Sequence, residues 1–343
     1  MQRAEMGEFA FIARIQRQFS APCNFVPLGI GDDAAAVIPS PGKYSLLTTD
    51  TLIEGTHFNR AYSTFEQVGL KALAVNLSDI AAMGGRARAF LVSLGVPQNM
   101  PLSDLTALYR GIAKASRAAS IVLIGGNTTC SKGPFFITVT LLGEASKKQM
   151  VTRAGANQED AIYVTGTVGD AAAGLDCLQK GHSVKANAAL IRRHQIPRAR
   201  SAEGLLLGQL RIPSAMIDLS DGLTADLDHL LTQSGVGAEL RLDHIPVSPA
   251  LKRYAKRHEV DTLDFALSGG EDYELLFTVS ETKGKKLEKL IKRGLIQATR
   301  IGTILPKKAG LIGRTAEGKT RKIAPGGYDH FARRKPLNVE NNE

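Results

Sequence analysis

The chain has 343 residues, a formal net charge of +10 and a hydrophobic content of 43%. A chain of this length predicts about two domains, and this composition is ordinary for a globular protein. Tryptophan is absent and aromatic residues make up only 6%, which argues against a platform that stacks nucleic-acid bases. No apolar run approaches the length that spans a membrane. We therefore expect neither nucleic acid nor a membrane as a partner.

The positive charge is concentrated near the C-terminus, where nine Lys and Arg accompany two acidic residues between positions 306 and 335. A solvated basic face explains this run better than contact with nucleic acid, and it would attract anionic substrates. The cysteines Cys23, Cys130 and Cys177 are scattered and form no CxxC motif. This pattern favours reduced, buried thiols in a cytoplasmic protein.

The first half of the chain predicts strands around one long helix. A strand is expected over 44–49, ending at Asp50. Apolar residues at helical spacing predict a helix over 66–83 that ends at Gly84-Gly85. Three short apolar or β-branched runs predict further strands over 89–96, 121–124 and 135–142.

A polar stretch over 146–149 is the best linker candidate. After it the alternation of strands and helices begins again, with strands expected over 161–165, 215–218 and 273–279 and helices over 169–178 and 223–231. We therefore predict an α/β (α+β) protein with two domains, 1–148 and 149–343.

Acidic or amide residues recur in short segments rich in Gly, Ser and Thr. These segments lie at 29–34, 48–58, 76–85, 125–129, 218–223 and 268–275. Carboxylates gathered in one place repel each other unless divalent cations bridge them, and hard oxygen ligands suit Mg²⁺. A site with several Mg²⁺ ions and little else usually handles phosphates.

Asp79 is the sharpest of these candidates, because it lies near the C-terminal end of a predicted helix, where the helix dipole disfavours negative charge. A cation or a structural salt bridge would explain it. A helix N-cap explains one of Asp218 and Asp221 but not both. Asp33 and Asp50 could be metal ligands, or belong to an ordinary turn and a solvated loop.

Familiar nucleotide-binding motifs are missing. There is no G-x-x-x-x-G-K-[ST] loop and no protein-kinase H-R-D or D-F-G set. The segment GIGDDA is too short a match for a dinucleotide-binding fingerprint.

Taken in order, the segments resemble the thiamine-monophosphate kinase family. The set is GIGDDA, TTDTLIEGTHF, LAVNLSDIAAMG, GGNTT, RAGA, YVTGTVGDAAAGL, DLSDGL, LSGGEDYEL and GYDHF. The resemblance implies an aminoimidazole-ribonucleotide synthetase-like fold. An N-terminal ATP- and Mg-binding domain would form a barrel shared between two protomers of a homodimer, beside a C-terminal α/β domain. It also implies Mg²⁺-assisted, in-line transfer of a phosphoryl group from ATP to thiamine monophosphate, giving thiamine diphosphate, in the cytoplasm.

The same resemblance assigns roles to individual residues. The catalytic aspartates would be Asp33, Asp50, Asp79 and Asp218. The Mg²⁺ ligands would be Asp33, Thr48, Thr49, Asp50, Asp79, Asn127, Asp218 and Asp221. ATP would contact Tyr109, Gly126, Asn127, Arg153 and Ser220, and thiamine monophosphate would contact His57, Glu271 and Tyr328.

One position departs from the family pattern. The family has GGD where this chain has Gly125-Gly126-Asn127. An asparagine keeps a carbonyl oxygen for Mg²⁺ but loses a charge, so one metal would bind less tightly. Two alternatives stay open: a sister ATP-dependent enzyme with another acceptor, and a non-catalytic protein that binds nucleotide or thiamine phosphate.

Overall fold

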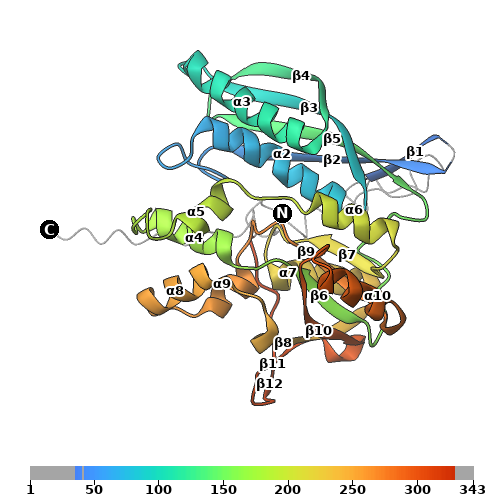
Figure 1. Ribbon diagram of the computed structural model, residues 1–343. Coiled ribbons are helices and arrows are strands. Elements are labelled where there is room, and N and C mark those ends of the chain that lie inside the picture. The colour runs from blue at the N-terminus through green and yellow to red at the C-terminus, as the bar shows by residue number, and fades with distance from the viewer. Residues whose placement is uncertain (1–34, 41, 329–343) are drawn as a thin grey trace, which may run out of the picture.

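The computed structural model describes residues 35–40 and 42–328. The chain builds two β-sheets, one from each half of the sequence, with helices packed against them (Figure 1). The first sheet has the order β1-β2-β5-β3-β4. Its strands are β1 (Ala35–Ser40), β2 (Lys43–Ile53), β3 (Arg86–Pro97), β4 (Val122–Ser131) and β5 (Phe136–Ser146).

One face of the first sheet is covered by α2 (Phe65–Ala82) and α3 (Leu102–Ala119), as Figure 1 shows. On β5 the alternating residues Ile137, Val139 and Leu141 are buried in the core under these helices. The neighbouring strands pair antiparallel except β3 and β4, which run parallel. The period-two burial is that of a sheet with one covered face.

Helix α2 begins with a capping box, in which the side chains of Thr64 and Gln67 each accept a backbone N–H of the other. It packs closely on α3 because both helices carry a glycine at the crossing. A Cβ on Gly111 would lie 2.0 Å from the Glu66 carbonyl oxygen, and a Cβ on Gly69 would lie 2.2 Å from the Leu108 carbonyl oxygen.

The second sheet has the order β12-β11-β8-β10-β6-β9-β7. Its strands are β6 (Ala161–Thr165), β7 (Ala215–Asp218), β8 (Val236–Arg241), β9 (Leu275–Val279), β10 (Ala298–Pro306), β11 (Leu311–Arg314) and β12 (Thr320–Lys322). The helices of this half are α4 (Asp170–Gln179), α5 (Ala188–Gln195), α6 (Ser201–Gln209), α7 (Leu223–Ser234), α8 (Pro249–His258), α9 (Thr262–Ser268) and α10 (Glu281–Lys292). Two short 3₁₀ turns, η1 (Leu242–His244) and η2 (Lys307–Ala309), follow β8 and β10.

The two halves meet along α2, which contacts β2 and β5 on one side and α6 and β7 on the other. Its last turn contributes Ala81 and Ala82 to a hydrophobic cluster that also contains Leu207 and Met216 of the second half. A Cβ on Gly204 of α6 would lie 2.3 Å from the Ala81 carbonyl oxygen. This close approach brings the C-terminal end of α2 next to β7.

Several predicted elements are confirmed, and several boundaries were wrong. Strands 161–165 and 215–218 match β6 and β7, and the long helix matches α2. The first strand does not end at Asp50, because its backbone stays paired with β5 as far as Ile53, and the hydroxyl of Thr51 also contacts that of Thr138.

The other two corrections concern β4 and β9. The strand predicted over 121–124 does not stop before the GGNTT segment, since that segment pairs in parallel with β3 as part of β4. The last strand begins at Leu275 rather than at position 273, because Tyr273 has a φ of +51° that leaves the extended conformation. Cys130, expected to be buried, is exposed on β4.

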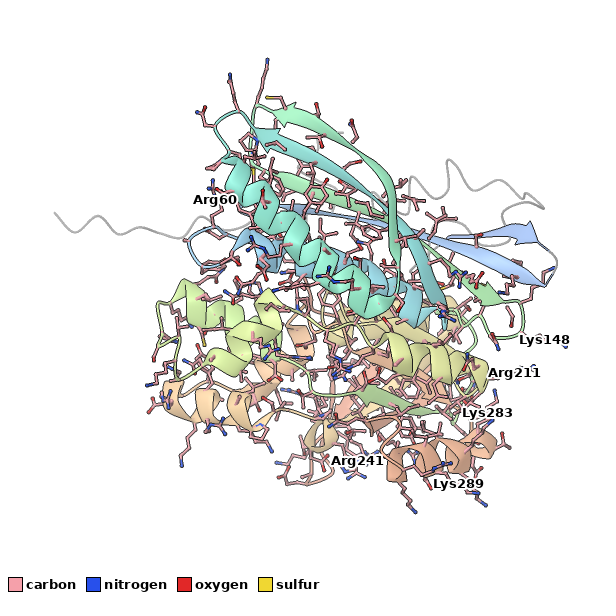
Figure 2. All side chains as sticks on the ribbon, turned by 45° about the horizontal axis from the view of Figure 1, so that its top comes forward. Arg60, Lys148, Arg211, Arg241, Lys283 and Lys289 are labelled. Carbon is pink, nitrogen blue, oxygen red and sulfur yellow. The ribbon has the colours of Figure 1, made fainter. Side chains whose placement is uncertain are left out.

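The basic side chains labelled in Figure 2, among them Lys148, Arg211 and Lys289, lie at the periphery of the molecule, and these three are exposed. Within residues 35–40 and 42–328, no helix combines the length and the apolar character needed to cross a membrane.

Candidate functional site

Two loops of the second half lie side by side and form the base of the candidate site. One follows β7 and contains residues 218–222, and the other precedes β9 and contains residues 269–274. The backbone N–H groups of Glu271 and Tyr273 donate to the carbonyl oxygens of Ser220 and Leu219, at 2.8 Å each. The Leu219 N–H returns a bond to the Glu274 carbonyl oxygen at 2.9 Å.

These bonds hold Glu271 and Tyr273 in left-handed backbone conformations, with φ of +68° and +51°. Such conformations are uncommon for residues other than glycine, and they cluster at functional sites where the surroundings enforce them. The loop thus fixes the directions of two side chains that a regular strand would have placed differently.

Tyr273 marks the place where the predicted carboxylates converge. Its side chain is buried, and burial raises the pKa of its phenol, as do the negative charges of Glu271, Asp50, Asp218 and Asp79. The four carboxylates belong to β2, α2, β7 and the loop before β9. The structure therefore gathers carboxylates from both halves of the chain around one tyrosine.

Asp79 lies in the last turn of α2, which contains no basic residue, and its carboxylate accepts a hydrogen bond from the hydroxyl of Thr48. Thr48 and Asp50 share the face of β2 that carries the buried Leu46 and Leu52, because alternate residues of a strand face the same side. Thr49 faces the opposite side, where its hydroxyl lies 3.1 Å from that of Thr140. Its role as a metal ligand stays a prediction.

The donor set suits Mg²⁺, because it consists of hydroxyl and carboxylate oxygens. Among the residues that the structure describes, no three His, Cys, Asp or Glu side chains are arranged as a ready metal cage. Mg²⁺ commonly uses one or two carboxylates together with water and substrate phosphates, so this arrangement fits it. Asp33, the remaining predicted catalytic aspartate, lies outside the described residues.

Asp226 organises the loop after β7, although the sequence did not single it out. Its carboxylate accepts the backbone N–H groups of Asp221 and Gly222, at 3.1 Å each. Burial raises the pKa of Asp226, and so does the charge of Asp221, while these N–H groups and the Arg153 charge oppose the shift. Asp221 and Arg153, both predicted site residues, therefore lie near the same buried carboxyl group.

Tyr328 is held beside the same loop. Its backbone N–H donates to the Asp221 carbonyl oxygen at 3.1 Å. The hydroxyl oxygen of the buried Thr224 lies 2.9 and 3.0 Å from the carbonyl oxygens of Gly326 and Leu267, to either of which it can donate its one proton, and it accepts the Gly326 N–H at 3.1 Å. The segment before Tyr328 is thereby attached to the first turn of α7, and the Tyr328 ring remains partly exposed.

A second group of residues surrounds Glu271. The Nζ atom of Lys71 lies 2.6 Å from Glu271 Oε1 and donates to the His57 carbonyl oxygen at 2.9 Å. The Nδ1 atom of His194 lies 2.9 Å from Glu271 Oε2. Burial by itself would raise the pKa of Glu271, but the charge of Lys71 and the contact with His194 outweigh it and lower the pKa to about 2.

The ring of His57 has a defined tautomer. The backbone N–H of Ile53 donates to His57 Nδ1 at 3.0 Å, so this nitrogen carries no proton. In the neutral ring the proton is therefore on Nε2, which can donate to a ligand. His57, Lys71 and His194 all line a small pocket, together with Phe58, Ser63, Val68 and Gln195.

Asp272 and Glu274 hold the same loop from behind. Asp272 accepts the backbone N–H groups of Gly169 and Ala171 at the start of α4, at 2.6 and 3.2 Å. The fully buried Glu274 binds Arg200 through two contacts of 2.5 and 2.6 Å, Arg193 at 2.6 Å and Thr165 at 2.6 Å. These contacts rigidify the loop without reaching into the site.

Three predicted ATP contacts lie away from this cluster in the single chain. Gly126 and Asn127 are exposed on β4, and Tyr109 is exposed on α3. In the sheet, Gly126 is in register with Asp50 across β3 and β5. Three strand spacings separate them by roughly 14 Å.

Sequence reasoning missed Lys71, His194, Asp226 and Tyr273. A signal existed for Lys71, because a lysine inside the apolar run LKALAV requires a buried partner. His194 and Asp226 lie in ordinary amphipathic helices, where no local pattern separates a site residue from a surface residue.

Comparison with known proteins shows the family to which the chain belongs. AIR synthase related protein, N-terminal domain, matches residues 31–145, and AIR synthase related protein, C-terminal domain, matches residues 157–313. Together with the two sheets, these matches define a two-domain protein of the AIR synthase related class and confirm the predicted fold class.

Individual relatives show which family within the AIR synthase related class the chain resembles. Thiamine-monophosphate kinase of Escherichia coli (strain K12) is 38% identical over 330 residues, covering 95% of this chain and 98% of that protein. Thiamine-monophosphate kinase of Aquifex aeolicus (strain VF5) is 36% identical over 333 residues, covering 96% and 100%. The solved structure "AaThiL complexed with AMPPCP and TMP" aligns with a TM-score of 0.84 and 35% identity, covering 96% and 99%. The chain belongs to the thiamine-monophosphate kinase family.

Proposed function

We propose that this protein transfers the γ-phosphoryl group of ATP to thiamine monophosphate, giving thiamine diphosphate. The observation that carries the proposal is the convergence of Asp50, Asp79 and Asp218 around Tyr273, close to Glu271, which Lys71 joins to the His57 turn. A related structure that aligns over nearly the whole chain is described as a complex with an ATP analogue, AMPPCP, and with TMP.

The acceptor is already an anionic phosphate oxygen, so the reaction needs no strong general base. The difficulty is to bring two polyanions together in line. Thr48, Asp50, Asp79 and Asp218 would hold Mg²⁺, with Asp33, Thr49, Asn127 and Asp221 as further predicted ligands. The bound metal would neutralise phosphate charge and orient the transferred group.

The organic part of thiamine monophosphate would occupy the side of the site formed by His57, Glu271 and Tyr328. Glu271 stays ionised at neutral pH, which suits the positive thiazolium ring. The partly exposed Tyr328 ring could stack on a flat cationic heterocycle. Ser220 and Arg153, on the neighbouring loops, would contact ATP, with Arg153 adding a fixed positive charge.

The active form is proposed to be a homodimer built on β4. Val122, Leu123 and Ile124 are exposed large apolar residues on this edge strand. An exposed apolar edge of this kind is typical of a sheet that pairs with another chain. A barrel shared by two protomers would cover it and change the surroundings of Gly126 and Asn127. Domain limits of 1–148 and 149–343 and a cytoplasmic location complete the proposal.

The proposal is tested by incubating the purified protein with Mg²⁺ and γ-labelled ATP, and with thiamine monophosphate, free thiamine or no acceptor. Label should appear in thiamine diphosphate only with thiamine monophosphate. Free thiamine offers a neutral hydroxyl that needs a general base, so it should remain unlabelled. Labelled thiamine monophosphate formed from free thiamine would contradict the assignment. Binding of both ligands without release of ADP would indicate a non-catalytic binding protein instead.

A further inference from the structure

Lys71 is an unusual lysine, because it lies inside α2 with only 2% of its side chain exposed. A buried ammonium group requires partners for its charge and its protons. Its Nζ atom has two: the Glu271 carboxylate at 2.6 Å and the His57 carbonyl oxygen at 2.9 Å. These belong to the two halves of the chain, and both residues are predicted contacts of thiamine monophosphate.

The Glu271 carboxylate is held from both sides. Lys71 contacts Oε1, and His194 of α5 contacts Oε2 at 2.9 Å. The Glu271 side chain remains 24% exposed, so it is not sealed off by these two contacts. Two fixed contacts on a side chain with three rotatable bonds leave it a single orientation, and the left-handed backbone of Glu271 adds a further constraint.

The His57 side of the pocket depends on the same lysine. Residues 53–58 form a tight turn, in which the backbone N–H groups of Thr56 and His57 donate to the Ile53 carbonyl oxygen at 3.1 and 2.9 Å. Lys71 fixes the carbonyl group at the end of this turn. It therefore ties the His57 turn to the Glu271 carboxylate.

Further contacts near Lys71 join the same two halves of the chain. The Gln195 side chain of α5 donates to the Tyr62 carbonyl oxygen and accepts a bond of 3.0 Å from Gln67 of α2. The rings of Tyr62 and His194 have centroids 6.4 Å apart. Lys71 and Glu271 form an ion pair between the same two halves.

We propose that Lys71 is a positioning residue for thiamine monophosphate, an inference that rests on the proposed function. It joins the two halves of the substrate pocket by holding the Glu271 carboxylate and the His57 turn at a fixed separation. Its two partners, the Glu271 carboxylate and the His57 carbonyl oxygen, are not among the predicted metal ligands. Its loss should therefore weaken the binding of thiamine monophosphate far more than the binding of ATP.

The test measures steady-state kinetics of the full chain and of Lys71→Met, which keeps an unbranched apolar stem and removes the ammonium group with its charge. Thiamine monophosphate is varied at saturating Mg-ATP, and ATP at saturating thiamine monophosphate. The KM for thiamine monophosphate should rise at least tenfold, equivalent to about 1.4 kcal/mol. The KM for ATP and the kcat should change less than about threefold.

The matched control is Lys114→Met. Lys114 also pairs with a glutamate, Glu66, but on the exposed surface of α3 and α2, where such pairs contribute little. Its kinetic constants should equal those of the wild type. If Lys71→Met does not fold, Lys71→Gln serves instead, since its amide keeps a hydrogen-bond donor on a side chain that is one atom shorter. The KM for thiamine monophosphate should then rise less than tenfold but remain above that of the wild type.

A double-mutant cycle with Glu271→Gln separates positioning from general destabilisation. If Lys71 acts through Glu271, Glu271→Gln should raise the KM for thiamine monophosphate much less in the Lys71→Met background than in the wild type. Equal effects in both backgrounds, or parallel increases in both KM values, would overturn the inference. Absence of turnover in the wild type would instead overturn the proposed function and this inference with it.

Discussion

The pKa values of two neighbouring carboxyl groups in one loop, Glu271 and Asp272, are shifted in opposite directions. The pKa of Glu271 falls to about 2, because Lys71 and His194 outweigh the effect of burial. The pKa of Asp272 rises to about 7, because burial dominates and the N–H groups of Gly169 and Ala171 offset it only partly. The difference shows that a partner with a formal charge, rather than burial alone, keeps a site carboxylate ionised.

This difference predicts how Glu271 affects stability at low pH. A carboxyl group whose pKa is lower in the folded state stabilises the fold above its unfolded pKa of 4.5, and this contribution is lost as the pH falls toward 2. A shift of this size corresponds to about 3 kcal/mol. Between pH 5 and pH 2.5, the free energy of unfolding of the wild type should therefore fall more steeply than that of Glu271→Gln, measured by urea titration.

Glu66→Gln is the control for this measurement. Glu66 also pairs with two cations, Lys114 and Arg110, but these are more than half exposed and the pairing is screened by solvent. Between pH 5 and pH 2.5, the free energy of unfolding of Glu66→Gln should fall as steeply as that of the wild type. If the free energy of unfolding falls equally steeply in the wild type and in Glu271→Gln, then Lys71 and Glu271 do not form the ion pair described above.

Asp79 gives the corresponding prediction for the metal. Asp79→Asn keeps an oxygen that accepts the Thr48 hydroxyl and removes a charge from the C-terminal turn of α2, where the dipole disfavours it. The thermal midpoint without metal should stay level or rise. A weakened Mg²⁺ site should lower turnover roughly tenfold or more at limiting Mg²⁺. The control is Asp104→Asn at the start of α3, away from the site, which should leave activity unchanged at the same Mg²⁺ concentration. Full activity of Asp79→Asn at limiting Mg²⁺ would show that Asp79 is structural.

At the scale of elements, α2 determines the site by being the helix that both sheets share. Its neighbours approach so closely that only glycine fits at the crossings with α3 and α6. Fixing the helix in this way fixes Asp79 relative to Asp218 and Lys71 relative to Glu271. The site therefore depends on helix packing at least as much as on its own loops.

Gly111→Ala should test this dependence. The new Cβ would lie 2.0 Å from the Glu66 carbonyl oxygen, so α3 must move away from α2. Overpacking of this kind should destabilise the protein by about 2 kcal/mol. Gly284→Ala is the matched control, because nothing lies within 4 Å of its Cβ and alanine favours helix α10 by up to about 1 kcal/mol. Thermal unfolding of both variants decides; a neutral Gly111→Ala would contradict the tight crossing.

The elements also show what the sequence could and could not predict. The helix that carries Asp79 and the strands that end at Asp218 and Val279 follow from periodicity, which is local. The continuation of β2 through Asp50 depends on pairing with β5, whose facing residues Thr140 and Thr138 are 91 and 87 positions from Thr49 and Thr51. The left-handed conformations of Glu271 and Tyr273 depend on bonds to the loop after β7. Local pattern and family resemblance pointed to the carboxylates, but the residues that hold the surrounding structure, Lys71 at Glu271 and Asp226 at the loop after β7, appear only in three dimensions.

At the scale of the whole molecule, the site lies at the junction of two halves that are each built on a separate core. The carboxylates come from both halves, and the pocket near Glu271 closes only where α2 meets α5. The halves must therefore be docked for the site to exist. In contrast, β4 with Gly126 and Asn127 faces away from this junction and is exposed along nearly its whole length.

The exposed strand β4 leads to the last prediction, that the protein is a dimer through this edge. Ile124 is 55% exposed, and Val122 and Leu123 beside it are similarly open. A charge in their midst would be buried on association without a partner, at a cost of several kcal/mol. Ile124→Glu should therefore convert the dimer to a folded monomer, with half the wild-type mass by light scattering and an unchanged circular dichroism spectrum. Val184→Glu, which places the same charge at another exposed apolar position, should remain a dimer. If the wild type is itself a monomer across micromolar concentrations, or if Ile124→Glu remains dimeric, then β4 is not the interface. If Ile124→Glu is monomeric and also loses ATP binding, then the predicted nucleotide contacts Gly126 and Asn127 depend on assembly, because the substitution leaves the carboxylate cluster of the single chain intact.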